Sequence, residues 1–229
     1  MEPPAACLFD LDGLLLDTEP LHGQAWRQAA ARFGTHLDDR QLLQLRGRRR
    51  LDCAEQVRRW IAGDGVAPPS REELLAVRQP IAEALLPGAP AMPGARELVS
   101  RCGELAIPMA ITTSSSAAAV ALKSRGHPWL EQIRERVYGD DPELGRGKPA
   151  PDPFLLAARR LGVASAECWA FEDSPAGAQA ALEAGCRVHV YVAPGIPFEL
   201  FPAGVLRLVS LAEVRLGRPE MPAVAERAQ

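Results

Sequence analysis

The segment Phe9-Asp10-Leu11-Asp12-Gly13 is the most informative part of this sequence for the fold. The apolar run from Ala5 to Phe9 predicts a short buried strand that ends at two aspartates. Because side chains alternate along a strand, Asp10 and Asp12 share a face, where two acids repel each other unless a cation or a shared proton is present. Such a pair suits Mg²⁺-assisted chemistry in which one carboxylate attacks and the other handles a proton. A strand that merely ends in an Asp-Gly turn is the alternative interpretation.

Length and composition indicate an ordinary globular protein. The 229 residues are 47% hydrophobic and 24% charged, so the chain can bury a sizeable core. The net charge of −3 gives no electrostatic reason to expect a nucleic acid or an anionic membrane as partner. No apolar stretch approaches the length of a membrane span, and no basic leader precedes the first strand. We therefore expect no signal peptide and a cytoplasmic location.

The cysteines and histidines predict neither a zinc site nor a disulfide framework. The five cysteines are odd in number and scattered, and no Cys-x-x-Cys or Cys/His cluster occurs. We expect them to be small buried side chains in a reducing compartment. His189 lies in an apolar run and is expected to be structural, whereas His36 and His127 lie in turn-like surroundings without an evident partner.

Short apolar runs alternate with helical patterns along most of the chain, which predicts a parallel sheet covered by helices. The expected strands are 6–9, 107–112, 136–138, 168–171, 188–192 and a short edge strand at 206–209. The expected helices of this part are 95–101, 117–125, 153–161 and 175–184. The fold class is therefore α/β, with a doubly wound parallel sheet.

Residues 17–87 have a different pattern, with helical periodicity and no convincing strand. Residues 87–94 are rich in proline and glycine and are interpreted as the return linker, and residues 13–16 as the outgoing one. We therefore expect an all-helical cap, residues 17–87, inserted into a core made of residues 1–16 and 88–229.

Polar residues follow three further predicted strands, at the edge where a doubly wound sheet binds its ligand. The run Thr113-Ser114-Ser115-Ser116 precedes a helix and could hold a phosphate through hydroxyls and free amides, although ordinary helix capping explains it as well. Lys148, followed by prolines, could place a positive charge against a phosphoryl group, unless it is a solvated loop lysine. Glu172 and Asp173 end the fourth strand. Asp173 facing Asp10 would suit Mg²⁺, which prefers oxygen ligands.

The order and topological positions of these clusters resemble the haloacid dehalogenase superfamily of phosphohydrolases, in the branch with a helical cap inserted after the first motif. The matching stretches are FDLDGLLLDTEP, AITTSS, GKPAPDPF and FEDSPAGAQAALEAG. The stretch GDDPELGRGKPAPDPFL is similar to the branch of pseudouridine-5′-phosphatase and glycerol phosphatase. The resemblance implies a Rossmann-like core and phosphatase chemistry.

The resemblance also implies a role for each core residue. Asp10 would be the nucleophile that forms an aspartyl-phosphate, and Asp12 would protonate the leaving alkoxide and then deprotonate the attacking water. Thr113, the Ser114 amide and Lys148 would bind the transferring phosphoryl group. Dehalogenase members lack an acid at the position of Asp12, so halide chemistry is disfavoured.

The cofactor implied by the resemblance is Mg²⁺. It would be held by the Asp10 carboxylate, the Asp12 backbone carbonyl and Asp173, with Glu172 close by or bridged through water. We expect a small-molecule phosphate ester as the substrate, no nucleic acid or membrane partner, and a monomer or weak dimer.

Substrate choice is expected to come from the cap, which can close over the site. Its run Arg46-Gly47-Arg48-Arg49-Arg50 is mostly a solvated basic face, but one arginine, best Arg50, could contact a second substrate oxygen. Arg46, Gly47, Arg50 and His22 fall where β-phosphoglucomutase-like relatives carry cap and hinge residues. A phosphatase of sugar, polyol or nucleoside monophosphates is the preferred function. A hexose-phosphate mutase and a non-catalytic metabolite-binding protein are the alternatives.

Overall fold

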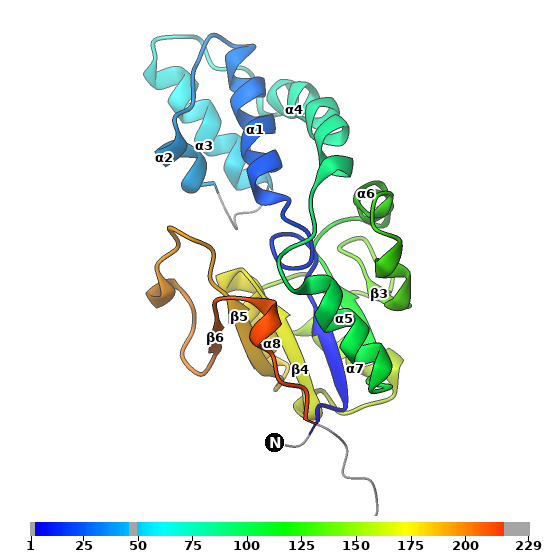
Figure 1. Cartoon of the computed structure of the whole chain (residues 1–229). Coiled ribbons are helices and arrows are strands. Elements are labelled where there is room, and N and C mark those ends of the chain that lie inside the picture. Colours follow the sequence, from blue (N-terminus) through cyan, green and yellow to red (C-terminus); the bar gives the residue numbers. More distant parts are fainter. Residues whose placement is uncertain (1–2, 46–49, 218–229) are drawn as a thin grey trace, which may run out of the picture.

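The computed structural model describes residues 3–45 and 50–217. An α/β core contains all the strands, and a group of four helices lies beyond the carboxyl end of the first strand (Figure 1). Within the described ranges, no helix is both long and apolar enough to span a membrane.

Six parallel strands form the sheet of the core. They are β1 (Ala6–Phe9), β2 (Met109–Thr112), β3 (Glu135–Val137), β4 (Cys168–Glu172), β5 (Arg187–Tyr191) and β6 (Leu206–Leu208). Their order is β3-β2-β1-β4-β5-β6, so the chain starts in the middle, moves out through β2 and β3, and returns beside β1 with β4. This is the order of a doubly wound sheet, and the predicted fold class is confirmed.

Helices cover both faces of the sheet. They are α5 (Ala95–Glu104), α6 (Ala117–Ser124), α7 (Asp152–Leu161) and α8 (Pro175–Glu183). Short 3₁₀ turns occur at η1 (Leu86–Gly88), η2 (Pro128–Gln132), η3 (Ser165–Glu167), η4 (Phe198–Leu200) and η5 (Leu211–Glu213). Because neighbouring strand residues point to opposite faces, Leu8 packs in the cluster that includes α7 and α8, and Phe9 packs with α5 and α6.

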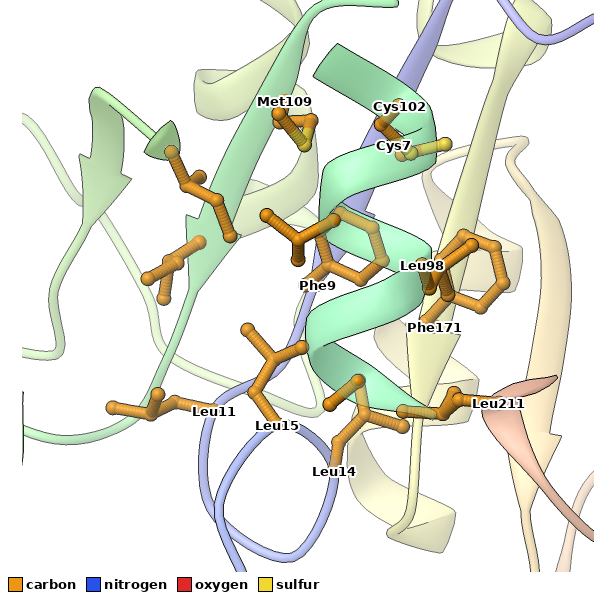
Figure 2. Close-up of a cluster of buried hydrophobic side chains, with 14 of the residues drawn as sticks. Cys7, Phe9, Leu11, Leu14, Leu15, Leu98, Cys102, Met109, Phe171 and Leu211 are labelled. Carbon is orange, nitrogen blue, oxygen red and sulfur yellow. The ribbon is translucent and has the colours of Figure 1, made fainter. Parts of the chain in front are cut away.

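The apolar cluster under α5 fixes the end of β1. Phe9 stacks on Phe171 of β4 with ring centroids 5.0 Å apart. Figure 2 shows both rings beside Leu98 of α5, with Leu11 continuing the cluster toward the loop that leaves β1. Packing on both sides of the strand therefore determines where the backbone of Asp10 lies. All five cysteines are buried and none forms a disulfide, as expected.

Four of the helices between β1 and β2 have an apolar core of their own. They are α1 (Glu19–Ala31), α2 (Asp39–Leu43), α3 (Arg50–Gly63) and α4 (Arg71–Leu85). Trp26, Val57, Ile61 and Leu74 are among the buried residues of that core. These helices lie over the carboxyl ends of the strands (Figure 1). The boundaries of the cap at residues 17 and 87 remain a prediction.

The two linkers between core and helices pair with each other. Leu16 and Ala91 form an antiparallel bridge, and the amide of Asp17 donates to the carbonyl oxygen of Pro90 at 2.9 Å. The expectation that His127 lacks a partner is wrong. It is buried, and its Nε2 lies 2.7 Å from the carbonyl oxygen of Ala89, because the turn that follows α6 packs against the return linker.

Candidate active site

Asp10 follows β1 directly and is held by Lys148. The Nζ of Lys148 donates to Asp10 Oδ1 at 2.6 Å, to the carbonyl oxygen of Thr112 at 2.8 Å and to Glu172 Oε1 at 2.5 Å. Burial lowers the pKa of Lys148, but Asp10 and Glu172 raise it by more, so the ammonium stays charged. Three acceptors for three protons fix this charge beside the Asp10 carboxylate.

The carboxylates at the ends of β1 and β4 carry more negative charge than the single ammonium of Lys148 can neutralise. Asp10, Glu172 and Asp173 each offer an oxygen, and these oxygens lie within 4.8 Å of one another. Burial raises the pKa of Asp10 to about 7, with Glu172 and Asp12 adding to the rise and Lys148 opposing it. Burial and the same acidic neighbours raise the pKa of Asp173 well above its usual range. Oxygen donors with excess negative charge fit a divalent cation such as Mg²⁺.

Glu172 and Asp173 differ in how their carboxylates are engaged. Glu172 is fully buried, and besides Lys148 it accepts a hydrogen bond from the hydroxyl of Ser174 at 3.1 Å. Gly177 lies so close to Glu172 that a Cβ there would collide with the carboxylate. The Asp173 side chain, by contrast, accepts no hydrogen bond from any residue that the structure describes. Asp173 is therefore the more available ligand, and Glu172 chiefly positions Lys148.

Asp12 is surrounded by donors. Its Oδ1 accepts from Thr18 Oγ1 at 2.8 Å, and its Oδ2 accepts from Ser115 Oγ at 2.9 Å and from Lys123 Nζ at 2.5 Å. Burial alone would raise the pKa of Asp12, but the charge of Lys123, the nearby His22 and these hydrogen bonds lower it overall. Asp12 is therefore an ordered carboxylate beside the nucleophile position.

The loop after β2 brings Thr113 and Ser114 to the same edge of the sheet. Thr113 is buried, and its hydroxyl accepts a hydrogen bond from the Ser115 amide at 3.1 Å. Ser114 is exposed, and its backbone amide has no acceptor in the part of the chain that the structure describes. An unpaired amide next to Asp10 and Lys148 suits an anionic oxygen.

The cap residues predicted for the site are placed differently from one another. His22 lies beside Asp12, with its Nε2 3.9 Å from Asp12 Oδ1, and Arg78 bonds its Nδ1 at 2.8 Å. Burial lowers the pKa of His22 to about 4, so the ring is neutral near pH 7. Arg50 is exposed and bonds Gln79 within the cap, so its contact with a substrate remains a prediction. Arg46, Gly47, Arg48 and Arg49 lie outside the described residues.

Three residues of the site were not predicted from the sequence as site residues: Thr18, Arg78 and Lys123. Ser115 lies in the run that was expected to hold a phosphate, and its hydroxyl donates to Asp12. Lys123 had the clearest signal, because the chain contains only two lysines and 24 arginines, and the other lysine is Lys148. Lys123 also falls three positions after the buried Val120, on the inner side of its helix. Arg78 had no comparable signal in a chain so rich in arginine.

This fold and this site define a phosphohydrolase in which a lysine holds an aspartate at the end of the first strand. A model of the haloacid dehalogenase-like hydrolase family matches residues 4–185, and the chain belongs to this family.

Two curated proteins and a solved structure are similar over most of the chain. It is 37% identical to (DL)-glycerol-3-phosphatase 2 of Arabidopsis thaliana, over 79% of this chain and 76% of that protein. It is 34% identical to a probable pseudouridine-5′-phosphatase of Drosophila melanogaster, over 96% of this chain and 95% of that protein. A putative beta-phosphoglucomutase from Thermotoga maritima superposes with a TM-score of 0.76 at 26% identity, covering 93% of this chain and 96% of that one. The chain is thus a phosphoric monoester hydrolase of small phosphorylated metabolites.

Proposed function

We propose that this phosphatase depends on Mg²⁺, acts on sugar, polyol or nucleoside monophosphates, and transfers the phosphoryl group first to Asp10 and then to water. The observation that carries the proposal is the contact between Lys148 and Asp10, made where Glu172 and Asp173 also offer carboxylate oxygens. Phosphoryl transfer needs positioning and charge neutralisation more than any other contribution, and this cluster supplies both.

In the first step, an oxygen of Asp10 bonds to phosphorus while the bond from phosphorus to the ester oxygen breaks. Asp12, which enters this step in its protonated form, gives its proton to the departing alkoxide and becomes the carboxylate. Lys148 with the Ser114 amide binds the phosphoryl oxygens. In the second step, Asp12 takes a proton from water as the water oxygen attacks phosphorus. Inorganic phosphate leaves and Asp10 is free again.

Asp10, Asp173 and the Asp12 carbonyl are the groups that would hold Mg²⁺, with Glu172 behind them. When bound, the cation would neutralise negative charge on the phosphoryl group and on the carboxylates. The raised pKa values of Asp10 and Asp173 support this assignment, since both carboxylates lack enough positive charge from the protein alone.

The proposed substrate class rests on the relatives, whose names specify glycerol 3-phosphate and pseudouridine 5′-phosphate as the esters that they hydrolyse. Both are monoesters of a primary alcohol on a small polar molecule. The cap helices over the site would select among such molecules through His22 and neighbouring side chains.

A screen of phosphate release tests the proposal. It would compare glycerol 3-phosphate, pseudouridine 5′-monophosphate, hexose phosphates and nucleoside monophosphates, each with Mg²⁺. We expect steady release from one or more of them without any bisphosphate activator. The structural similarity to a protein named as a mutase motivates a second arm. Conversion of β-glucose 1-phosphate to glucose 6-phosphate far faster than phosphate appears, and only with a bisphosphate present, would establish the mutase instead.

A further inference from the structure

Lys123 is a buried lysine whose ammonium lies at the active site. It is in the last turn of α6, and only 1% of its side chain is exposed. Its Nζ donates to Asp12 Oδ2 at 2.5 Å and to Ser115 Oγ at 2.7 Å, and Ser115 Oγ donates to the same Asp12 oxygen at 2.9 Å. The three groups therefore form a closed triangle around one carboxylate oxygen.

A stabilising role in the fold does not explain this arrangement well. Lysine is rarely buried, because removing an ammonium from water is unfavourable, and a buried ion pair is often no more stable than an apolar pair of the same volume. The other buried residue of α6 is Val120, and the rest of the helix is rich in alanine. An apolar side chain at position 123 would suit such a helix better. The lysine side chain instead extends to the one carboxylate that the proposed reaction needs for proton transfer.

The two oxygens of Asp12 are held by residues from different segments of the chain. Lys123 and Ser115 come from α6 and the loop before it, and they hold Oδ2. Thr18, the residue directly before α1, holds Oδ1. Lys148 bonds Asp10 and Glu172, so each of the two lysines of the chain serves a different aspartate.

We propose that Lys123 is a positioning residue that fixes the Asp12 carboxylate for its proton transfers. The proposal rests on the proposed function, in which Asp12 protonates the leaving alkoxide and deprotonates water. Lys123 touches neither the substrate nor the phosphoryl group; it acts through Asp12. Without it, Asp12 can turn away from the ester oxygen, although Asp10 and Lys148 remain in place to attack and bind phosphorus.

Substrates with different leaving groups distinguish a positioning role of Lys123 from a purely structural one. An alkoxide is a poor leaving group and needs the proton of Asp12, whereas p-nitrophenolate departs without one. In a two-step mechanism kcat/KM reports only the steps up to transfer to Asp10. A misplaced Asp12 should therefore lower kcat/KM for an alkyl phosphate and leave that for p-nitrophenyl phosphate nearly unchanged, whereas a loss of folded enzyme lowers both equally.

The test compares wild type with Lys123→Met, using p-nitrophenyl phosphate and the alkyl monophosphate that wild type hydrolyses fastest. We expect kcat/KM for the alkyl ester to fall by about tenfold or more, as for a disturbed general acid, and that for the aryl ester by less than about threefold. Val120→Ala is the matched control, since it alters the same buried side of α6 without touching Asp12. It should change both esters alike.

A second comparison keeps the test decisive if Lys123→Met folds poorly. Lys123→Met combined with Asp12→Asn removes both charges, and its burst of p-nitrophenolate should be as fast as that of Asp12→Asn alone, because coupled residues are not additive. Equal losses on both esters in the single variant, or a further loss in the double variant, would overturn the role of Lys123. Phosphate release by the wild-type enzyme from the two esters tests the proposed phosphatase function itself. A failure of that function can therefore be distinguished from a failure of the role proposed for Lys123.

Discussion

Asp10 and Asp12 are two residues apart, yet the protein shifts their pKa values in opposite directions. Burial, Glu172 and Asp12 raise the pKa of Asp10 despite Lys148, whereas Lys123 and His22 lower that of Asp12 against the effect of burial. Leu11 between them is fully buried, which anchors the backbone and turns both acids to the same side. The two aspartates are therefore in different environments. Asp10 has excess negative charge around it that a cation would neutralise, whereas Asp12 is already surrounded by hydrogen-bond donors of the protein.

At the residue scale, Asp10→Asn should abolish turnover, by a factor on the order of 10³ or more, because an amide does not attack phosphorus as a carboxylate does. The variant should fold, since Lys148 keeps its contacts with Glu172 and the Thr112 carbonyl. Circular dichroism checks the fold, and mass spectrometry of trapped wild-type enzyme should place the phosphate on Asp10. Phosphate on a serine of the run 114–116 would contradict the mechanism.

His189 carries a second prediction at this scale. It is buried on β5 between Trp169 and Phe171, with ring centroids 4.9 and 5.0 Å away, and its Nδ1 has no partner among the described residues. Burial and then Arg187 lower its pKa from 6.5 to about 4. Between these two values the unfolded chain binds the proton and the folded protein does not, so stability falls as pH falls from about 6.5 to 4. The loss approaches about 3 kcal/mol.

The variant His189→Phe should lack this loss, since a phenyl ring can stack in the same place and does not titrate. Urea unfolding of both proteins at pH 7 and pH 4.5 gives the comparison. Asp10 and Asp173, whose raised pKa values act in the opposite direction, are present in both proteins and cancel in the difference. Parallel stability curves for the two proteins would show that His189 does not contribute.

At the scale of elements, the loop between β3 and α7 positions Lys148 through contacts at its two ends. Asp141 accepts two hydrogen bonds from Arg160 of α7, both at 2.8 Å, and Asp152 accepts one from the Arg146 amide at 3.2 Å. Asp140 accepts from the Ala117 amide at the start of α6. The acidic residues of the stretch GDDPELGRGKPAPDPFL thus tie α6 and α7 to the loop. The similarity of this stretch to the phosphatase branch therefore reflects contacts that position the loop of Lys148, and it does not identify a particular substrate.

The contact between Asp140 and α6 gives a testable consequence. Asp140→Ala removes an acceptor for the Ala117 amide, 2.9 Å away, and should lower the free energy of unfolding by about 1 kcal/mol. Asp140→Asn keeps an acceptor oxygen and should retain most of the stability. Denaturant titrations measure both. Equal destabilisation by the two substitutions would argue against capping and for a charge effect.

Much of the core could be predicted because its signals are local. Short apolar runs mark the strands, and Ser174, directly before α8, caps this helix by accepting a hydrogen bond from the Gly177 amide at 3.1 Å. Lys123 and Arg78 could not be placed in this way, since a charged side chain on a helix is expected in solvent. What makes their burial tolerable is a partner on another element, Asp12 for the first and His22 for the second. Such pairings exist only once the chain has folded.

At the scale of the whole molecule, a chelator should eliminate activity and added Mg²⁺ should restore it. A cation that binds only the folded state also stabilises it, by about 2.7 kcal/mol at a hundred times Kd, so Tm should rise by several degrees. Asp173→Asn should lose most of this rise, whereas Asp64→Asn, on the exposed cap surface, should keep it. Differential scanning fluorimetry with and without Mg²⁺ gives the measurement. Full activity without metal would contradict the roles of Asp10 and Asp173.

The bridge between Leu16 and Ala91 has a consequence for the order of folding. Cys7 of β1 pairs with Met109 of β2, so the centre of the sheet depends on a contact across the whole helical insertion. Helices form quickly from local contacts, and closing a loop becomes less unfavourable as the loop shortens. Once the insertion has folded and its two ends have met, the loop between Cys7 and Met109 is roughly fourfold shorter, which saves about 1 kcal/mol of chain entropy. The helices that cover the finished site would thus also speed the assembly of the sheet beneath them.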